Sequence, residues 1–86
     1  MRSLLLSRDA QKELSRLPVS VAKSIAAKIL ALREDPLPYG VKRLKSSKFY
    51  RLRCADYRIV YGFDAKSITV ALIEKRDEVY RRTRRF

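Results

Sequence analysis

The strongest strand signal in the chain is the segment Asp56-Tyr57-Arg58-Ile59-Val60-Tyr61-Gly62-Phe63. It is rich in β-forming residues, and apolar or aromatic side chains recur at every second position: Tyr57, Ile59, Tyr61 and Phe63. Successive side chains of a strand point to opposite faces, so these residues share one face. We interpret the tyrosines and the phenylalanine of this stripe as core residues, because an apolar stripe at strand spacing is typical of a buried face.

Strand signals on either side extend this segment into a sheet. The segment 48–53 is short and contains aromatic residues, and its residue types alternate along the chain. The segment 67–75 contains the run Ile68-Thr69-Val70-Ala71-Leu72-Ile73. That run is apolar on both faces, as in a central strand. The connections at 54–55 and 64–66 have the length of hairpin loops. The sequence therefore predicts a three-strand meander over about residues 48–75.

The first half of the chain has helical spacing instead. Residues 4–6 are leucines, which suit an opening strand, and residues 8–34 show apolar positions at helical intervals on either side of Pro18. Because proline ends a helix, this region predicts a helical hairpin over about residues 8–34, with Ser7 or Asp9 available as its N-terminal cap. A loop rich in proline and glycine follows at 35–40.

The element order is strand, helix, helix, strand, strand, strand. It predicts an α+β fold in which an N-terminal strand and a two-helix hairpin pack on a mostly antiparallel sheet of about four strands. A chain of 86 residues is too short for two ordinary domains of roughly 100–150 residues each. We therefore expect a single domain over residues 1–86, closed by a basic tail at 80–86.

The composition excludes several classes of protein. The chain has no histidine, which removes the commonest general base and the commonest metal ligand. Its single cysteine excludes a disulfide framework and a cysteine-rich zinc site. No stretch approaches the roughly 18 apolar residues of a membrane span. We expect a cytoplasmic protein with no metal, no other cofactor and no membrane partner.

Positive charge is concentrated in the second half. Residues 1–41 hold seven Lys or Arg against four Asp or Glu, a net of +3, whereas residues 42–86 hold fourteen against five, a net of +9. The fields of clustered cations add, so a polyanion would dock on the second half. This asymmetry favours a nucleic acid or an acidic protein as partner over a surface that is merely solubilising.

Strand alternation brings several arginines of the basic half together. Arg51 and Arg53 are two positions apart and share a face, and Arg58 lies across a short hairpin from them. Arg76 ends the last strand, and Tyr80 follows within reach of the same end. Guanidinium groups offer planar, bidentate donors to phosphate and stay charged at any working pH. These residues predict a phosphate site, where the tyrosine stacks on an unpaired base or passes a proton.

Each candidate also has a structural interpretation. Arg58 stands in an otherwise apolar strand, where a charge usually has a partner. In a structural ion pair that partner would be Asp56, Glu74 or Asp77. The other candidates would then be ordinary solvated strand or tail residues.

Some segments combine these tyrosines and basic residues in a fuller pattern: Leu44-Lys45, Phe49-Tyr50-Arg51-Leu52-Arg53, Asp56-Tyr57-Arg58-Ile59-Val60-Tyr61 and Lys75-Arg76-Asp77-Glu78-Val79-Tyr80. The pattern resembles the RelE/ParE superfamily of toxins from toxin–antitoxin systems, and the first half of the chain agrees in layout. The resemblance implies a small sheet covered by two helices and an acidic antitoxin that wraps the basic surface. In the RelE branch it also implies cleavage of mRNA in the ribosomal A site.

The resemblance implies a role for each candidate residue. Arg51 and Arg53 take the places of basic residues on a strand of RelE-like nucleases, and Arg58 that of the arginine that binds the scissile phosphate. Arg76 matches the arginine linked to the transition state or leaving group, and Tyr80 the tyrosine that stacks on or orients the base. Further candidates for binding RNA are Lys45, Lys48, Arg81 and Arg82.

Some members of the superfamily have lysines where this chain has Arg51 and Arg53. A lysine with a depressed pKa can remove the 2′-hydroxyl proton, whereas an arginine hardly can. Catalysis would then depend on electrostatic stabilisation and on positioning, with weak or strictly ribosome-dependent activity. The weak candidates for a general base are Lys45, Lys48 and Glu74.

The expected partners are an acidic, RelB-like antitoxin, the ribosome and mRNA, with a heterotetramer or larger complex in which the antitoxin binds operator DNA. Two other functions remain open: a ParE-type inhibitor of DNA gyrase on the same fold, and a non-catalytic basic module that binds RNA or DNA. The ParE branch generally lacks the full residue set, so Arg76 together with Tyr80 favours the RelE branch.

Overall fold

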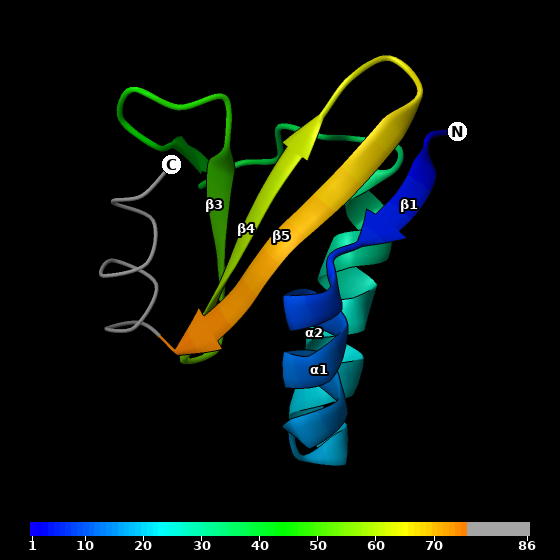
Figure 1. The fold of residues 1–86 in the computed structure, drawn as a ribbon, viewed down its shortest axis with the longest axis vertical. Coiled ribbons are helices and arrows are strands. Elements are labelled where there is room, and N and C mark those ends of the chain that lie inside the picture. Colours follow the sequence, from blue (N-terminus) through cyan, green and yellow to red (C-terminus); the bar gives the residue numbers. More distant parts are fainter. Residues whose placement is uncertain (76–86) are drawn as a thin grey trace.

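The protein is built on one sheet of five strands in the order β1-β5-β4-β3-β2 (Figure 1). The computed structural model describes residues 1–75. The strands are β1 (Ser3–Leu6), β2 (Lys42–Arg43), β3 (Tyr50–Cys54), β4 (Tyr57–Phe63) and β5 (Ser67–Lys75). β1 pairs with β5 in parallel and every other pairing is antiparallel, which confirms the predicted α+β fold with a mostly antiparallel sheet.

The predicted number of about four strands is corrected to five by β2, a strand of only two residues at the edge of the sheet. So short a segment shows no period that a sequence pattern could reveal. Gly40, whose φ of +90° favours glycine, precedes it in the turn that leads from the proline-rich loop back to the sheet. The meander itself begins at Tyr50, so that Lys48 lies in the loop before β3 rather than in the strand.

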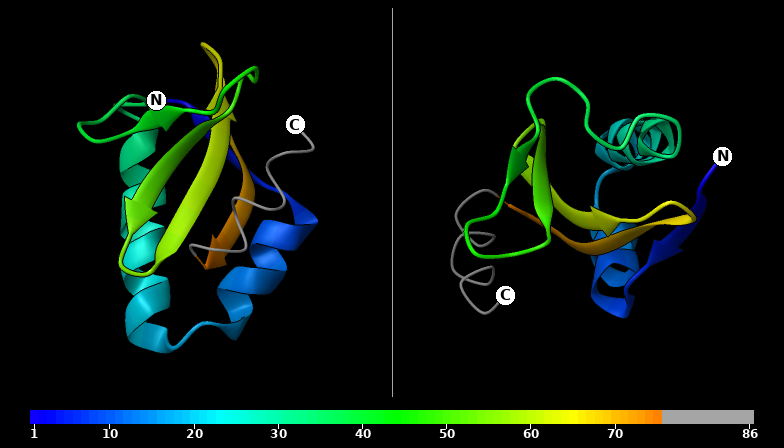
Figure 2. Two further views of the ribbon diagram at one scale, coloured as in Figure 1. Left: turned by 90° about the vertical axis from the view of Figure 1, so that its left-hand side faces the viewer. Right: turned by 90° about the horizontal axis from the view of Figure 1, so that it is seen from above.

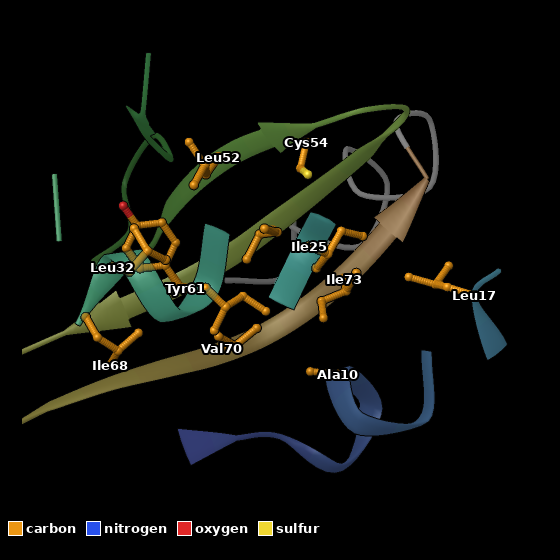
Figure 3. Close-up of a cluster of buried hydrophobic side chains, with 12 residues drawn as sticks. Ala10, Leu17, Ile25, Leu32, Leu52, Cys54, Tyr61, Ile68, Val70 and Ile73 are labelled. Atoms are coloured by element: carbon orange, nitrogen blue, oxygen red, sulfur yellow. The ribbon is translucent and has the colours of Figure 1, made fainter. Parts of the chain in front are cut away.

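The helical hairpin consists of α1 (Arg8–Arg16) and α2 (Val19–Leu32), within the predicted range of 8–34. Figure 2 shows the two helices meeting at their short connection beside Pro18. The core lies between this hairpin and one face of the sheet (Figure 3). Ile25 of α2 and Tyr61 of β4 are fully buried there, and Tyr57 and Phe63 pack against the same cluster. The aromatic stripe of β4 is therefore core, as predicted.

Ser7 connects α1 to the middle of the sheet. Its Oγ accepts the Ala10 backbone N–H at 3.0 Å as the N-cap of α1, and its hydroxyl donates to the Ala71 carbonyl at 2.6 Å. The register of β4 against β5 shifts between Val60 and Tyr61, which leaves Ala71 as the extra residue of a bulge. The bulge thus turns a carbonyl out of the ladder, and the Ser7 hydroxyl satisfies it.

Replacing Ser7 by Ala should lower the free energy of unfolding by about 1–2 kcal/mol, since it removes a helix cap and a hydrogen bond to the bulge. Urea unfolding followed by circular dichroism measures this loss. Ser15→Ala is the matched control, because the Ser15 hydroxyl bonds only to the Lys12 carbonyl within the same helix and is exposed. Equal losses in the two variants would contradict the role assigned to Ser7.

The side chain of Tyr61 is hydrogen-bonded to the loop that follows α2. Its hydroxyl donates to the Pro36 carbonyl at 2.6 Å, and burial raises the pKa of this phenol far above its usual value. Tyr61→Phe should cost about 1–2 kcal/mol of stability, because the Pro36 carbonyl loses its donor. Exposed Tyr39 supplies the control variant Tyr39→Phe, for which we expect no change in urea unfolding.

The raised pKa of Tyr61 also makes stability depend on pH. The folded protein keeps the phenol proton at a pH where the unfolded chain, whose tyrosines titrate near pH ~10, releases it. The free energy of unfolding should therefore fall as the pH rises above about 10, and Tyr61→Phe should lack this part of the fall.

Among residues 1–75, no helix is long and apolar enough to cross a membrane.

Candidate phosphate-binding site

The face of the sheet opposite the helices carries a cluster of cations. Register places Arg53 of β3 directly opposite Arg58 of β4, and Arg51 of β3 directly opposite Lys42 of β2. Facing residues of paired strands point to the same side, so all of these side chains share one face. Together with Gly40 they line a pocket of about 250 Å³, which we call the arginine pocket. Three of the residues predicted from the sequence thus meet in one place.

Burial differs strongly within the arginine pocket. Arg53 is exposed and Arg51 half-buried, whereas Arg58 is only 7% exposed. A buried guanidinium keeps its charge and has few water molecules to bind, so it interacts strongly with an anion that reaches it. Arg58 is therefore suited to hold a phosphate, and Arg53 to meet its outer oxygens.

The arrangement is unfavourable for the fold by itself. Like charges at directly opposed positions of neighbouring strands destabilise a sheet. This face holds two such pairs side by side, Arg53 with Arg58 and Arg51 with Lys42. The two pairs together produce a concentrated positive potential on this face, which attracts an anion.

Of the acidic residues predicted as partners of Arg58 in a structural ion pair, the structure places one beside it. Glu74 of β5 is the residue paired with Arg58 in the register and is equally buried, at 7% exposure. Asp56 instead lies exposed in the β3–β4 turn, and Asp77 lies outside the described residues. A carboxylate at the position of Glu74 can orient the Arg58 guanidinium without preventing its other donors from binding phosphate.

The remaining sequence candidates fall into two groups. Lys45 and Lys48 are exposed in the loop between β2 and β3, on either side of the positive-φ residue Ser46. The others lie outside the described residues, so the structure does not bear on them: Arg76, Tyr80, Arg81 and Arg82.

Lys42 is a pocket residue that sequence reasoning missed. Its place opposite Arg51 depends on β2, which sequence patterns do not reveal. In the segment Val41-Lys42-Arg43-Leu44 two adjacent basic residues stand between two apolar ones, so no alternation identifies Lys42. Within residues 1–75, no cluster of His, Cys, Asp or Glu could hold a metal ion.

The fold is a helical hairpin on one face of a small mixed sheet, with a cation-lined pocket on the other face. A family model described as the ParE toxin of the type II toxin–antitoxin system, parDE, matches residues 4–80. The chain belongs to this RelE/ParE superfamily of type II toxins. No curated protein is similar enough in sequence to match it.

Solved structures of the superfamily share the fold. The isolated E. coli RelE toxin is 25% identical, with a TM-score of 0.76 over 99% of this chain and 97% of that chain. RelE in the intact E. coli RelBE toxin–antitoxin complex is 23% identical, with a TM-score of 0.76 over 88% and 98%. A YoeB/ParE toxin from Agrobacterium tumefaciens is 15% identical, with a TM-score of 0.75 over 86% and 98%.

Proposed function

We propose that this toxin is an endoribonuclease that cleaves mRNA on the ribosome. The observation that supports this function best is the arginine pocket, where buried Arg58 is paired with exposed Arg53 beside half-buried Arg51. Such a pocket fits a phosphodiester whose negative charge increases during reaction. The likeness to the E. coli RelE toxin points to the same branch of the superfamily.

The proposed reaction uses the 2′-hydroxyl of the RNA itself as nucleophile. The 2′-oxygen forms a bond to the adjacent phosphorus while the bond from phosphorus to the 5′-oxygen breaks, so the products are a cyclic phosphate and a 5′-hydroxyl. The 2′-hydroxyl loses a proton and the leaving oxygen gains one. Because arginines hold their protons, the pocket contributes electrostatic stabilisation and in-line positioning rather than proton removal.

Within this mechanism, Arg58 holds the scissile phosphate, and Arg51 and Arg53 stabilise the charge that develops on its equatorial oxygens. Arg76 and Tyr80 complete the proposed site through the resemblance of their segment to RelE-like toxins. The basic residues Lys45 and Lys48 in the β2–β3 loop would bind neighbouring phosphates of the RNA.

The same cationic face also suits an acidic antitoxin. Relatives of similar fold were crystallised as RelB–RelE complexes, among them those of Methanococcus jannaschii and Pyrococcus horikoshii. We propose that a RelB-like antitoxin covers the arginine pocket of this toxin in the cytoplasm, in a heterotetramer or larger complex that binds operator DNA. Antitoxin and RNA would then compete for the same cations.

Inhibition of DNA gyrase is the second candidate function, because the matching family model is that of ParE toxins. One experiment separates the two. The purified toxin is added to a translating extract, where primer extension detects cut mRNA, and to a gyrase supercoiling assay. Cleavage with normal supercoiling supports the nuclease. Loss of supercoiling with intact mRNA supports the gyrase inhibitor. If neither effect is observed, the remaining candidate is a non-catalytic module that binds nucleic acid.

A further inference from the structure

A second pocket lies on the same face of the sheet as the arginine pocket, farther along β4. Its volume is about 330 Å³, and its lining includes Phe49 from the loop before β3, Gly62 of β4 and Thr69 of β5. Gly62 and Thr69 are paired in the register, so they form adjacent parts of this face. We call this the Phe49 pocket; the proposed cleavage reaction makes no use of it.

The ring of Phe49 lies against Gly62. Gly62 stands inside a strand, where glycine is less stable than a residue with a side chain. Its φ is not in the left-handed region, and a Cβ atom there would lie 3.5 Å from Cδ1 of Phe49, an ordinary contact. A larger side chain would meet this ring, so the glycine allows Phe49 to lie close to the sheet, where the ring forms one side of the pocket.

The lining of the Phe49 pocket has the chemistry of a site for an unpaired base. An aromatic ring offers a stacking surface to any base. The Lys48 ammonium lies 6.0 Å from the centre of that ring, where it can both interact with the π-system and meet a phosphate. The Thr69 hydroxyl lines the pocket as a donor or acceptor for a base edge.

Asp64 adds an acceptor to this pocket. Its Oδ1 accepts the backbone N–H groups of Lys66 and Ser67, each at 2.8 Å, and these bonds lower the pKa of the carboxyl. An ionised carboxylate only accepts hydrogen bonds, so it favours a base edge with N–H or amino donors.

The position of the Phe49 pocket matches the path of an RNA strand. Arg58, Val60 and Gly62 are alternate residues on one face of β4, and at about 3.3 Å per residue Gly62 lies roughly 13 Å from Arg58. Between them, Val60 and Leu72 form a small buried cluster against which Phe49 packs. A single strand whose phosphate occupies the arginine pocket can cross this distance within a few nucleotides.

We infer that the Phe49 pocket binds an unpaired nucleobase of the RNA strand whose phosphate occupies the arginine pocket. The inference rests on the proposed function, since it takes RNA as the substrate. It adds a second contribution that depends on the base, beside the one proposed for Tyr80, to a surface that otherwise recognises the charge of the backbone.

The test compares two RNA ligands of equal length and charge, an oligoadenylate and an abasic ribose-phosphate oligomer, in fluorescence anisotropy. The wild-type protein should bind the oligoadenylate roughly 5- to 100-fold more tightly than the abasic oligomer, as stacking of one base provides. Phe49→Leu, which removes the ring but keeps an apolar contact to Val60 and Leu72, should abolish most of this difference. Gly62→Val, whose methyl groups would meet the Phe49 ring and displace it from the sheet, should do the same.

Both variants should bind the abasic oligomer as tightly as the wild type does. Arg58→Lys is the matched control, and it should weaken both ligands by the same factor. A preference for bases that survives in both pocket variants, or no preference in the wild type, would overturn the inference. Failure of the proposed nuclease activity would be distinguishable from failure of this inference. A protein that binds the oligoadenylate more tightly than the abasic oligomer but does not cut translated mRNA would support the base site and contradict only the nuclease activity.

Discussion

Replacing Arg58 by Ala should reduce mRNA cleavage by roughly 10²- to 10³-fold, the usual effect of removing one preorganised donor to a developing oxyanion. Cells that express this variant should grow, whereas expression of the wild type should arrest growth. The reason is the burial of Arg58 in the lining of the arginine pocket, where it would interact with a bound phosphate through little intervening water. Induced expression and primer extension measure the two effects.

Loss of folding is the rival explanation for such a result. Arg58 and Glu74 are paired in the register and equally buried, so removing the cation alone leaves a carboxylate in an apolar setting. Removing one member of a buried charge pair lowers the free energy of unfolding by about 3–5 kcal/mol, which is a large fraction of the total stability of a small domain. The double variant Arg58→Met with Glu74→Gln removes both charges at similar volume, so it should fold and still lack activity.

Arg58→Lys distinguishes charge from geometry. It keeps a cation in the pocket but loses the planar pair of donors that matches a phosphate. An intermediate loss of cleavage is expected, with retention of antitoxin binding in a pull-down. Growth arrest by a folded variant without Arg58 would show that the arginine pocket is not the site of the reaction.

The sequence predicts the arginine cluster because a strand has a period of two. Arg51 and Arg53 share a face by alternation alone, and a short hairpin brings Arg58 to the same face. The exact partner depends on the place of the turn: the predicted connection at 54–55 would pair Arg53 with Asp56, whereas the observed turn at 55–56 pairs it with Arg58. The core side of β4 follows from the same rule. These are local consequences of spacing, so one sequence is enough to find them.

Features that depend on packing between distant segments are not accessible in this way. Lys42 joins the pocket only because two residues after the proline-rich loop pair with β3. The carbonyl of Ala71, the extra residue of the bulge, accepts a hydrogen bond from the Ser7 hydroxyl across 64 positions of sequence. The close approach of the Phe49 ring to Gly62 depends on how the β2–β3 loop places Phe49 over the sheet. None of these has a period or a motif, and each involves a contact far apart in the chain.

Removing both like-charge pairs should make the protein more stable and less active at once. The double variant Lys42→Thr with Arg53→Thr leaves Arg51 and Arg58 without an opposed cation in the register. We expect the free energy of unfolding to rise by about 0.5–2 kcal/mol, because each directly opposed pair contributes up to about 1 kcal/mol and threonine suits a strand. Binding to single-stranded RNA should weaken, and its dependence on salt should decrease by about two released counterions.

The direction of these two changes separates a functional cluster from a structural one. Lys75→Thr is the control, since Lys75 is exposed at the end of β5 and pairs with Tyr57, whose side chain packs with the core on the other face of the sheet. It removes one charge from a strand without relieving either pair, so it should leave stability nearly unchanged. The gain in the double variant should also disappear near 1 M salt, where charges are screened beyond about 3 Å.

A loss of stability in the double variant would mean that Lys42 and Arg53 serve the fold, and the case for an anion site would fail. A gain in stability without weaker RNA binding would mean that the anion binds elsewhere. Only the combined result, a more stable protein that binds RNA less tightly, fits a sheet that keeps repelling pairs because a phosphate backbone relieves them. In that case RNA should protect the wild type against unfolding more than it protects the variant, since a ligand that binds only the folded state stabilises it by an amount that rises with the logarithm of its affinity.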